Sequence, residues 1–100
     1  MAITASGPNN DNEYIISISG DFDFNQVKPF RQSYEEIPHA ARTVVIDFRK
    51  TDYMDSSGLG MLIKLRKYFG KDADIRLRTA NPQVMNILEI ARFGEQFNIE

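Results

Sequence analysis

The chain has 100 residues, of which 42% are hydrophobic and 26% charged, a composition typical of a globular domain and not of a disordered chain. It has no cysteine and one histidine, which excludes a disulfide framework, a thiolate nucleophile and any site built on several histidines. The net charge of −2 disfavours nucleic acid as a partner, and the apolar runs are far shorter than the roughly 20 residues of a membrane-spanning helix. The N-terminus also lacks the basic and apolar stretches of a signal peptide. We therefore expect a single cytoplasmic domain over residues 1–100 that binds neither nucleic acid nor membranes.

The first third of the chain predicts two strands and a helix. Residues 2–5 and 14–19 read as short strands, and a dense run of turn formers at 7–12 separates them, so we expect an antiparallel pair at one side of a sheet. Apolar residues then recur three or four positions apart, at Val27, Phe30, Tyr34 and Ile37. This spacing predicts an amphipathic helix with Pro29 in its first turn, and Pro38 ends it.

The rest of the chain alternates strands with helices. Strands are expected at 43–48, 75–79 and 97–99, and helices at 57–69 and from Asn81–Pro82 to about 91. The nearly continuous apolar run at 43–48 is typical of a strand covered on both faces, whereas 75–79 alternates as a strand with one solvated face. Strands that alternate with helices require crossover connections. The sequence therefore predicts an α/β domain with a mixed central sheet of about five strands and three to four helices.

The most informative segment runs from Asp52 to Gly60, directly after a buried strand and at the start of a helix. In open α/β sheets, ligands and reactive groups gather at such junctions. We expect Ser56 to cap the helix, its hydroxyl accepting from an N–H one turn further on. Gly58 and Gly60 lie in the first turn and allow a close approach to the backbone. Each costs roughly 1 kcal/mol relative to alanine, which tight helix–sheet packing or a functional contact has to offset.

Two interpretations of this segment remain open: a capped helix with small residues for packing, or a site that handles phosphate. A helix N-terminus favours an anion, which could belong to a nucleotide or to a modified serine. The nucleotide fits poorly, because neither a third glycine nor a P-loop lysine follows Gly58 and Gly60. A phosphorylated Ser56 fits better, since the fold would tolerate about two added charges there while neighbouring Asp55 opposes them. Such a change suits a switch.

The segment Met54–Gly60 resembles the phosphorylation motif of bacterial anti-sigma factor antagonists, the stand-alone members of the STAS domain family. Gly20–Asp23 is similar to the Gly-x-x-Asp element of that family, and 44–48 and 81–93 are similar to its central strand and third helix. The resemblance implies that Ser56 is the phosphoacceptor, with Ser57 as second choice. It also implies that Asp23 lies near this serine at the partner-binding surface. The partner-binding residues implied are Asp23, Asp55, Ser56, Ser57, Gly58, Leu59 and Gly60.

The resemblance further implies partner switching. The unphosphorylated form would bind a serine-kinase-type anti-sigma factor, or a response regulator with a kinase or phosphatase domain, and release the regulator's target. The kinase, using ATP and magnesium, would phosphorylate Ser56 and end binding, and a serine phosphatase would restore it. The chain itself would hold no cofactor, no metal and no catalytic residue. The alternative within the family is a non-switching accessory subunit of a transport complex.

Other features allow rival interpretations. Asp55, Ser56 and His39 could suggest a catalytic triad, but adjacent aspartate and serine cannot orient a histidine between them, and His39 is expected in a surface loop. Asp21 and Asp23 could form a metal or acid–base site, although a turn between strand and helix explains them better. The cations between Lys64 and Arg78 indicate a solvated helix face and the outer side of a strand, with a binding patch for an acidic protein surface as the alternative. Finally, Met61, Leu65 and Tyr68 could form part of an exposed partner-docking patch near Ser56, or they could lie at the periphery of the core without such a role.

Overall fold

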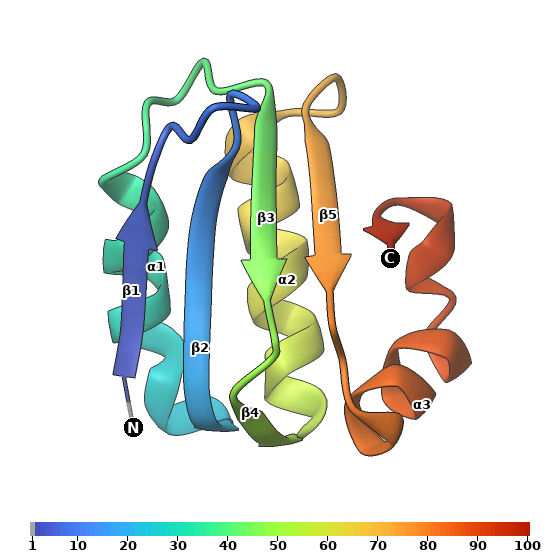
Figure 1. Ribbon diagram of the computed structural model, residues 1–100. Coiled ribbons are helices and arrows are strands. Elements are labelled where there is room, and N and C mark those ends of the chain that lie inside the picture. Colours follow the sequence, from blue (N-terminus) through green and yellow to red (C-terminus); the bar gives the residue numbers. More distant parts are fainter. Residues whose placement is uncertain (1) are drawn as a thin grey trace.

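In the computed structural model, which describes the backbone of residues 2–100 and the side chains of residues 3–100, one sheet carries all the strands (Figure 1). The strands are β1 (Ala2–Ser6), β2 (Tyr14–Phe22), β3 (Thr43–Asp47), β4 (Thr51–Met54), β5 (Asp74–Arg78) and β6 (Asn98–Ile99). The α-helices are α1 (Val27–Glu35), α2 (Ser56–Phe69) and α3 (Pro82–Ile90), and the 3₁₀ turns are η1 (Phe24–Gln26) and η2 (Phe93–Glu95). The predicted mixed α/β architecture is confirmed.

The strand order is β1-β2-β3-β5-β6, and β4 pairs with the last part of β2. β1 runs antiparallel to β2, with Ile3 opposite Ile18, which confirms the predicted pair, and all other pairings are parallel. The sheet has six strands where five were expected, because the segment after β3 forms a separate short strand, β4. Parallel neighbouring strands end at the same edge of the sheet. The residues that follow β2 and β4 therefore lie close together at that edge.

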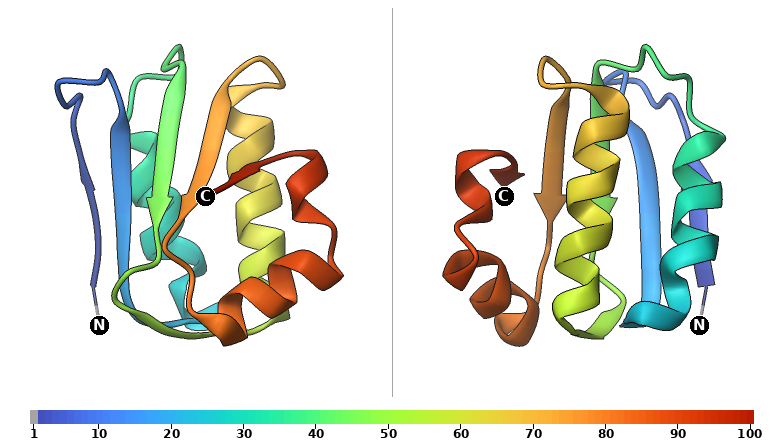
Figure 2. Two further views of the ribbon diagram at one scale, coloured as in Figure 1. Left: turned by 45° about the vertical axis from the view of Figure 1, so that its right-hand side comes forward. Right: turned by 180° about the vertical axis from the view of Figure 1, so that it is seen from behind.

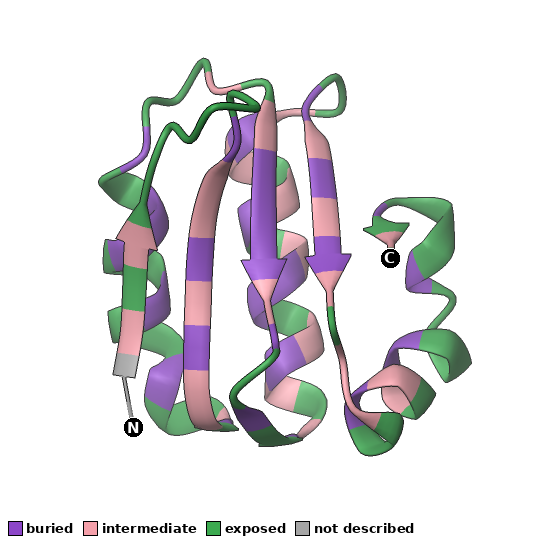
Figure 3. Cartoon of the chain, in the orientation of Figure 1, coloured by how far each residue is buried: buried purple, intermediate pink, exposed green. Residues whose placement is uncertain are grey.

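The helices α1 and α2 cover one face of the sheet, and α3 with η2 lies beside β5 (Figure 2). The core lies between the sheet and these helices, and fully buried side chains from both layers fill it, among them Ile16, Ile46, Leu62, Leu77 and Leu88. The alternation of buried and half-buried positions along β2 and β5 is visible in Figure 3. None of the helices in residues 2–100 is long and apolar enough to cross a membrane.

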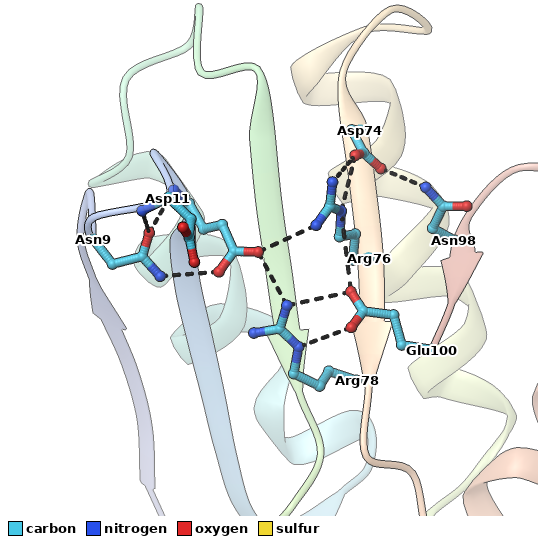
Figure 4. A network of polar contacts seen from close by, with 8 residues as sticks. Asn9, Asp11, Asp74, Arg76, Arg78, Asn98 and Glu100 are labelled. Atoms are coloured by element: carbon cyan, nitrogen blue, oxygen red, sulfur yellow. Dashed lines mark hydrogen bonds and ion pairs between the residues drawn. The ribbon is translucent and has the colours of Figure 1, made fainter.

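On its other face the sheet carries a network of charged side chains (Figure 4). Glu13, almost fully buried, accepts hydrogen bonds from the guanidinium groups of Arg76 (3.3 Å) and Arg78 (3.0 Å) and from Asn9 Nδ2 (2.9 Å). Arg78 also pairs with Glu100 at 3.1 Å. Arg76 and Arg78, the basic residues of β5, are therefore neutralised by carboxylates within the fold and do not form a free cationic patch.

Candidate functional site

The end of β2, the end of β4 and the start of α2 meet at one edge of the molecule, the lower edge in Figure 1. Phe22 and Met54 are paired in the parallel register, and the next residue, Asp55, donates its N–H to the Phe22 carbonyl at 3.4 Å. Asp23 follows directly on the end of β2, and Ser56 follows one residue after Asp55 at the start of α2. The structure thus brings together at this edge the two segments that the sequence singled out.

The N-cap of α2 is Asp55, so the prediction that Ser56 caps this helix is wrong. Asp55 Oδ1 accepts hydrogen bonds from the backbone N–H groups of Ser57 (2.8 Å) and Gly58 (3.3 Å). Both aspartate and serine make good caps, but the bond from the Asp55 N–H to β2 keeps Asp55 extended, and the helix begins one residue later. Ser56 is therefore the first helical residue, and capping does not depend on its hydroxyl.

Ser56 is exposed, and within the described part of the chain its hydroxyl makes no hydrogen bond to protein. Ser57, the neighbouring hydroxyl, is half-buried. Asp23 is half-buried as well, and its carboxylate caps η1 by accepting from the Asn25 N–H at 3.0 Å. This edge therefore presents one hydroxyl that solvent and another protein can reach without disturbing the fold.

The two glycines of this helix have different environments. A Cβ on Gly58 would lie 2.5 Å from Met54 Cγ, 2.8 Å from Met54 Sδ and 3.1 Å from Phe22 Cδ2, so its missing side chain lets α2 pack directly on the strand ends. A Cβ on Gly60 would meet nothing within 4 Å. The expectation of close intramolecular packing is thus met by Gly58 only. Gly60 is exposed one turn beyond Ser56, on the same side of the helix.

Exposed apolar side chains flank this edge. Phe24 in η1 is 66% exposed, Val27 at the start of α1 is 41% exposed, and Tyr53 in β4 is 48% exposed. Figure 1 and the rear view of Figure 2 both place η1 beside the first turn of α2. Phe24 and Tyr53 were not predicted as site residues, although the aromatic residue directly after Asp23 was an available signal in the sequence.

Met61, Leu65 and Tyr68 do not form an exposed docking patch near Ser56. Met61 and Leu65 are buried members of the hydrophobic core, so the prediction that they are exposed is wrong. Tyr68 is half-buried and packs against Tyr34 and Phe69, with ring centroids 5.0 Å apart in both contacts. The buried stripe of α2 is wider than the sequence pattern indicated, and it includes Met61 and Leu65.

The structure also places the residues of the rival interpretations. His39 is exposed, and its ring lies against Tyr68 with centroids 4.6 Å apart. Tyr68 lies more than three turns beyond Ser56 along α2, about 18 Å at 1.5 Å per residue, so His39 cannot act on the Ser56 hydroxyl. Asp21 is exposed, whereas Asp23 serves as a cap. Within residues 2–100, no three carboxylate or imidazole groups are arranged to hold a metal ion.

Of the cations noted in the sequence, Lys64, Lys67 and Lys71 are exposed as expected. Arg66 instead has a structural role. Its guanidinium donates to the carbonyls of Gly70 (2.5 Å), Ala73 and Gln96 (2.9 Å). Burial lowers the pKa of this guanidinium. Arg66 therefore closes the end of α2 and ties it to the C-terminal segment, away from Ser56.

The sequence of this chain is similar to those of known proteins. Residues 7–99 match the family model described as Mlab, STAS domain. A STAS-domain containing protein of Pseudomonas aeruginosa is 42% identical over 100 residues, which span 99% of both chains.

Solved structures share the fold. An anti-sigma factor antagonist from Mycobacterium paratuberculosis has a TM-score of 0.82 at 19% identity, with 98% of this chain and 85% of that chain covered. The anti-sigma factor antagonist SpoIIAA in its unphosphorylated form has a TM-score of 0.74 at 19% identity, over 99% of this chain and 87% of SpoIIAA. Phosphorylated SpoIIAA of Bacillus has the same TM-score at 18% identity, over 99% and 91%. The family match over nearly the whole sequence and the shared fold agree: the chain belongs to the STAS domain family.

Proposed function

We propose that this protein is an anti-sigma factor antagonist whose binding is switched by phosphorylation of Ser56. In this proposal the unphosphorylated protein binds a serine-kinase-type anti-sigma factor, or a related response regulator with a kinase or phosphatase domain, in the cytoplasm. The partner then releases its own target. The protein acts by binding, and the kinase and phosphatase supply the chemistry. The observation that carries the proposal is the exposed Ser56 hydroxyl, which is free of hydrogen bonds to the described residues and lies at the tip of a helix that Asp55 already caps.

The surroundings of Ser56 support a protein partner. The exposed Phe24 and Val27 provide apolar area beside a polar, acidic edge, as is typical of an interaction surface. Gly60 leaves the helix backbone uncovered next to Ser56 and has no packing reason within the fold. A glycine within a helix costs about 1 kcal/mol relative to alanine. Close approach of a partner to this turn explains why the cost is tolerated.

The local electrostatics favour a switch. The N–H groups of Ser57 and Gly58 already donate to Asp55, so they are not free to neutralise a phosphate on Ser56. The phosphate would therefore add about two negative charges beside the carboxylates of Asp55 and Asp23. Burying this uncompensated dianion in an interface would cost several kcal/mol. A loss of about 3 kcal/mol already weakens association more than a hundredfold.

Phosphorylation assays with candidate serine kinases and Mg²⁺–ATP test the proposal, with intact-mass and peptide mass spectrometry as the readout. We expect one phosphate on the wild-type protein and on Ser57→Ala, and none on Ser56→Ala. Phosphorylation of Ser57 alone would move the switch to the second-choice residue and refute the assignment of Ser56.

Binding assays give the second readout. Once a partner is identified, Ser56→Ala should bind it constitutively and Ser56→Asp should bind at least tenfold more weakly. If neither serine is phosphorylated and Ser56→Asp binds as tightly as the wild type, the switch is refuted. The protein would then behave as a non-switching STAS subunit, such as an accessory component of a transport complex.

A further inference from the structure

The outer edge of β4 is closed by side chains and not by another strand. Gln83, in the first turn of α3, uses both ends of its carboxamide on one residue of β4. Its Oε1 accepts from the Met54 N–H at 3.0 Å, and its Nε2 donates to the Met54 carbonyl at 3.0 Å. Asn81 acts further up the same edge, where its Nδ2 donates to the carbonyls of Thr51 (3.2 Å) and Asp52 (3.1 Å). The start of α3 thus replaces a neighbouring strand.

Met54 connects this contact to the acceptor serine. On its other edge, β4 pairs with β2, so the backbone of Met54 lies between Phe22 and Gln83. The buried Met54 side chain lies directly under Gly58, with Cγ 2.5 Å from the position of a Cβ there. The next residue in the chain, Asp55, caps α2 and sets its first residue, Ser56. A displacement of Met54 would therefore move both the cap and the packing surface of the helix tip.

Gln83 itself is firmly placed. The side chain of Asn81 caps α3 by accepting from the Val84 N–H at 2.9 Å, and Pro82 occupies the first turn. Val84 is fully buried, which anchors this turn on the core. Gln83 is exposed, so water can replace its carboxamide when it is removed. Loss of these two hydrogen bonds should loosen the end of β4 locally and leave the global fold intact.

We propose that Gln83 is a positioning residue for Ser56. It fixes Met54, and through Met54 the Asp55 cap, so that the backbone of Ser56 is held in one position at the helix tip. As a positioning role for phosphoacceptor chemistry, this inference rests on the proposed function. The coupling between α3 and the tip of α2 can nevertheless be measured without any kinase.

Native-state amide hydrogen exchange, followed by NMR on the ¹⁵N-labelled full chain, tests the coupling. We expect Gln83→Ala to accelerate exchange of the Met54, Ser57 and Gly58 amides about tenfold. Exchange at Leu65, in the middle of α2, should stay within twofold, and the melting temperature should change little. The matched control is Asn86→Ala, because Asn86 is an exposed amide residue on α3 that makes no hydrogen bond through its side chain to the described residues. It should leave all four amides unchanged.

Two results overturn the proposal. One is faster exchange of Met54 alone, with Ser57 and Gly58 unchanged, which would mean that Gln83 only satisfies the edge of β4. The other is a uniform acceleration that includes Leu65, which would mean general destabilisation. If Gln83→Ala does not fold, Gln83→Glu replaces it, because a carboxylate keeps the acceptor for the Met54 N–H and loses the donor to the Met54 carbonyl. The same two criteria then apply.

A kinase assay extends the test to function. With any kinase that modifies wild-type Ser56, Gln83→Ala should lower kcat about tenfold at an unchanged melting temperature, and Asn86→Ala should not. An unchanged kcat for Gln83→Ala would refute the positioning role. If no kinase modifies the wild type, the proposed function fails, while the exchange result on Gln83 still stands by itself.

Discussion

Alanine at Gly58 and alanine at Gly60 should change stability in opposite directions, although the two sites lie in the same turn of α2. The substitution removes the same backbone entropy in both cases and favours the helix by about 1 kcal/mol. At Gly60 nothing lies within 4 Å of the new methyl group, so this gain remains. At Gly58 the methyl group would meet Met54 Cγ at 2.5 Å and Phe22 Cδ2 at 3.1 Å, and both side chains are fully buried.

The packing penalty at Gly58 sets the magnitude. Forcing an extra methyl group into a filled core costs about 1–3 kcal/mol. Methionine adapts more readily than other side chains, but Met54 has no exposed surface into which it could move. We therefore expect Gly58→Ala to be about 1 kcal/mol less stable than the wild type and Gly60→Ala about 0.5–1 kcal/mol more stable. Because the helix-propensity gain is common to both variants, their difference measures the packing cost alone.

Urea unfolding, followed by circular dichroism with a shared m-value, gives the two free energies of unfolding. In thermal melts the expected separation is several degrees, since 1 kcal/mol shifts the midpoint of a domain of this size by about 4–8 °C. If Gly58→Ala proves as stable as Gly60→Ala, the tight contact between α2 and the strand ends is refuted. The proposed function adds that Gly60→Ala should weaken partner binding despite its higher stability.

Three further predictions concern the helix tip and the charged network. Asp55→Ala should lower the free energy of unfolding by about 1 kcal/mol in urea titrations, because it removes the α2 cap. Ser56→Ala should stay within about 0.5 kcal/mol of the wild type in the same assay, because the hydroxyl contributes nothing to the fold. Hydrogen bonds from Asn9 and Arg78 hold the pKa of Glu13 below its usual 4.5. The stability from Glu13 is therefore complete above about pH 4.5 and is lost as pH falls through the lowered pKa, so thermal melts of Glu13→Gln should show a weaker acid dependence.

The sequence predicts the larger elements of this fold because their signals are local. The period of apolar residues in α1 and α2, the alternation in β5 and the Asn81–Pro82 start of α3 each follow from neighbours in the chain. β4 was missed for the opposite reason. It has only four residues, and its edges are satisfied by β2 and by the side chains of Asn81 and Gln83, about 30 positions away. The pattern of residues close to β4 in the chain cannot indicate partners that are so far away in the sequence.

The segment of the candidate site stands out in the sequence, but its geometry follows from the sequence only in part. The segment Asp55–Gly60 offers two adjacent cap residues, and local preference does not distinguish them. The choice is made by the hydrogen bond from the Asp55 N–H to the Phe22 carbonyl, which depends on the sheet. The roles of the glycines, in contrast, were available from the sequence. Two residues two positions apart on a helix point about 200° apart, so Gly58 and Gly60 cannot both face the sheet.

Asp55 caps α2 and Ser56 does not, and this difference makes the tip of the helix suitable for the proposed switch. Had Ser56 been the N-cap, its oxygen would hold an N–H of the first turn, and esterification would disturb the cap and the helix with it. Here Asp55 holds the Ser57 and Gly58 amides, and the exposed Ser56 hydroxyl makes no hydrogen bond to the described residues. A phosphate can thus be added or removed at little cost in stability while the charge of the surface changes by about two. In the proposed function, the partner would then sense the phosphate through electrostatics, and the domain would not need to change shape.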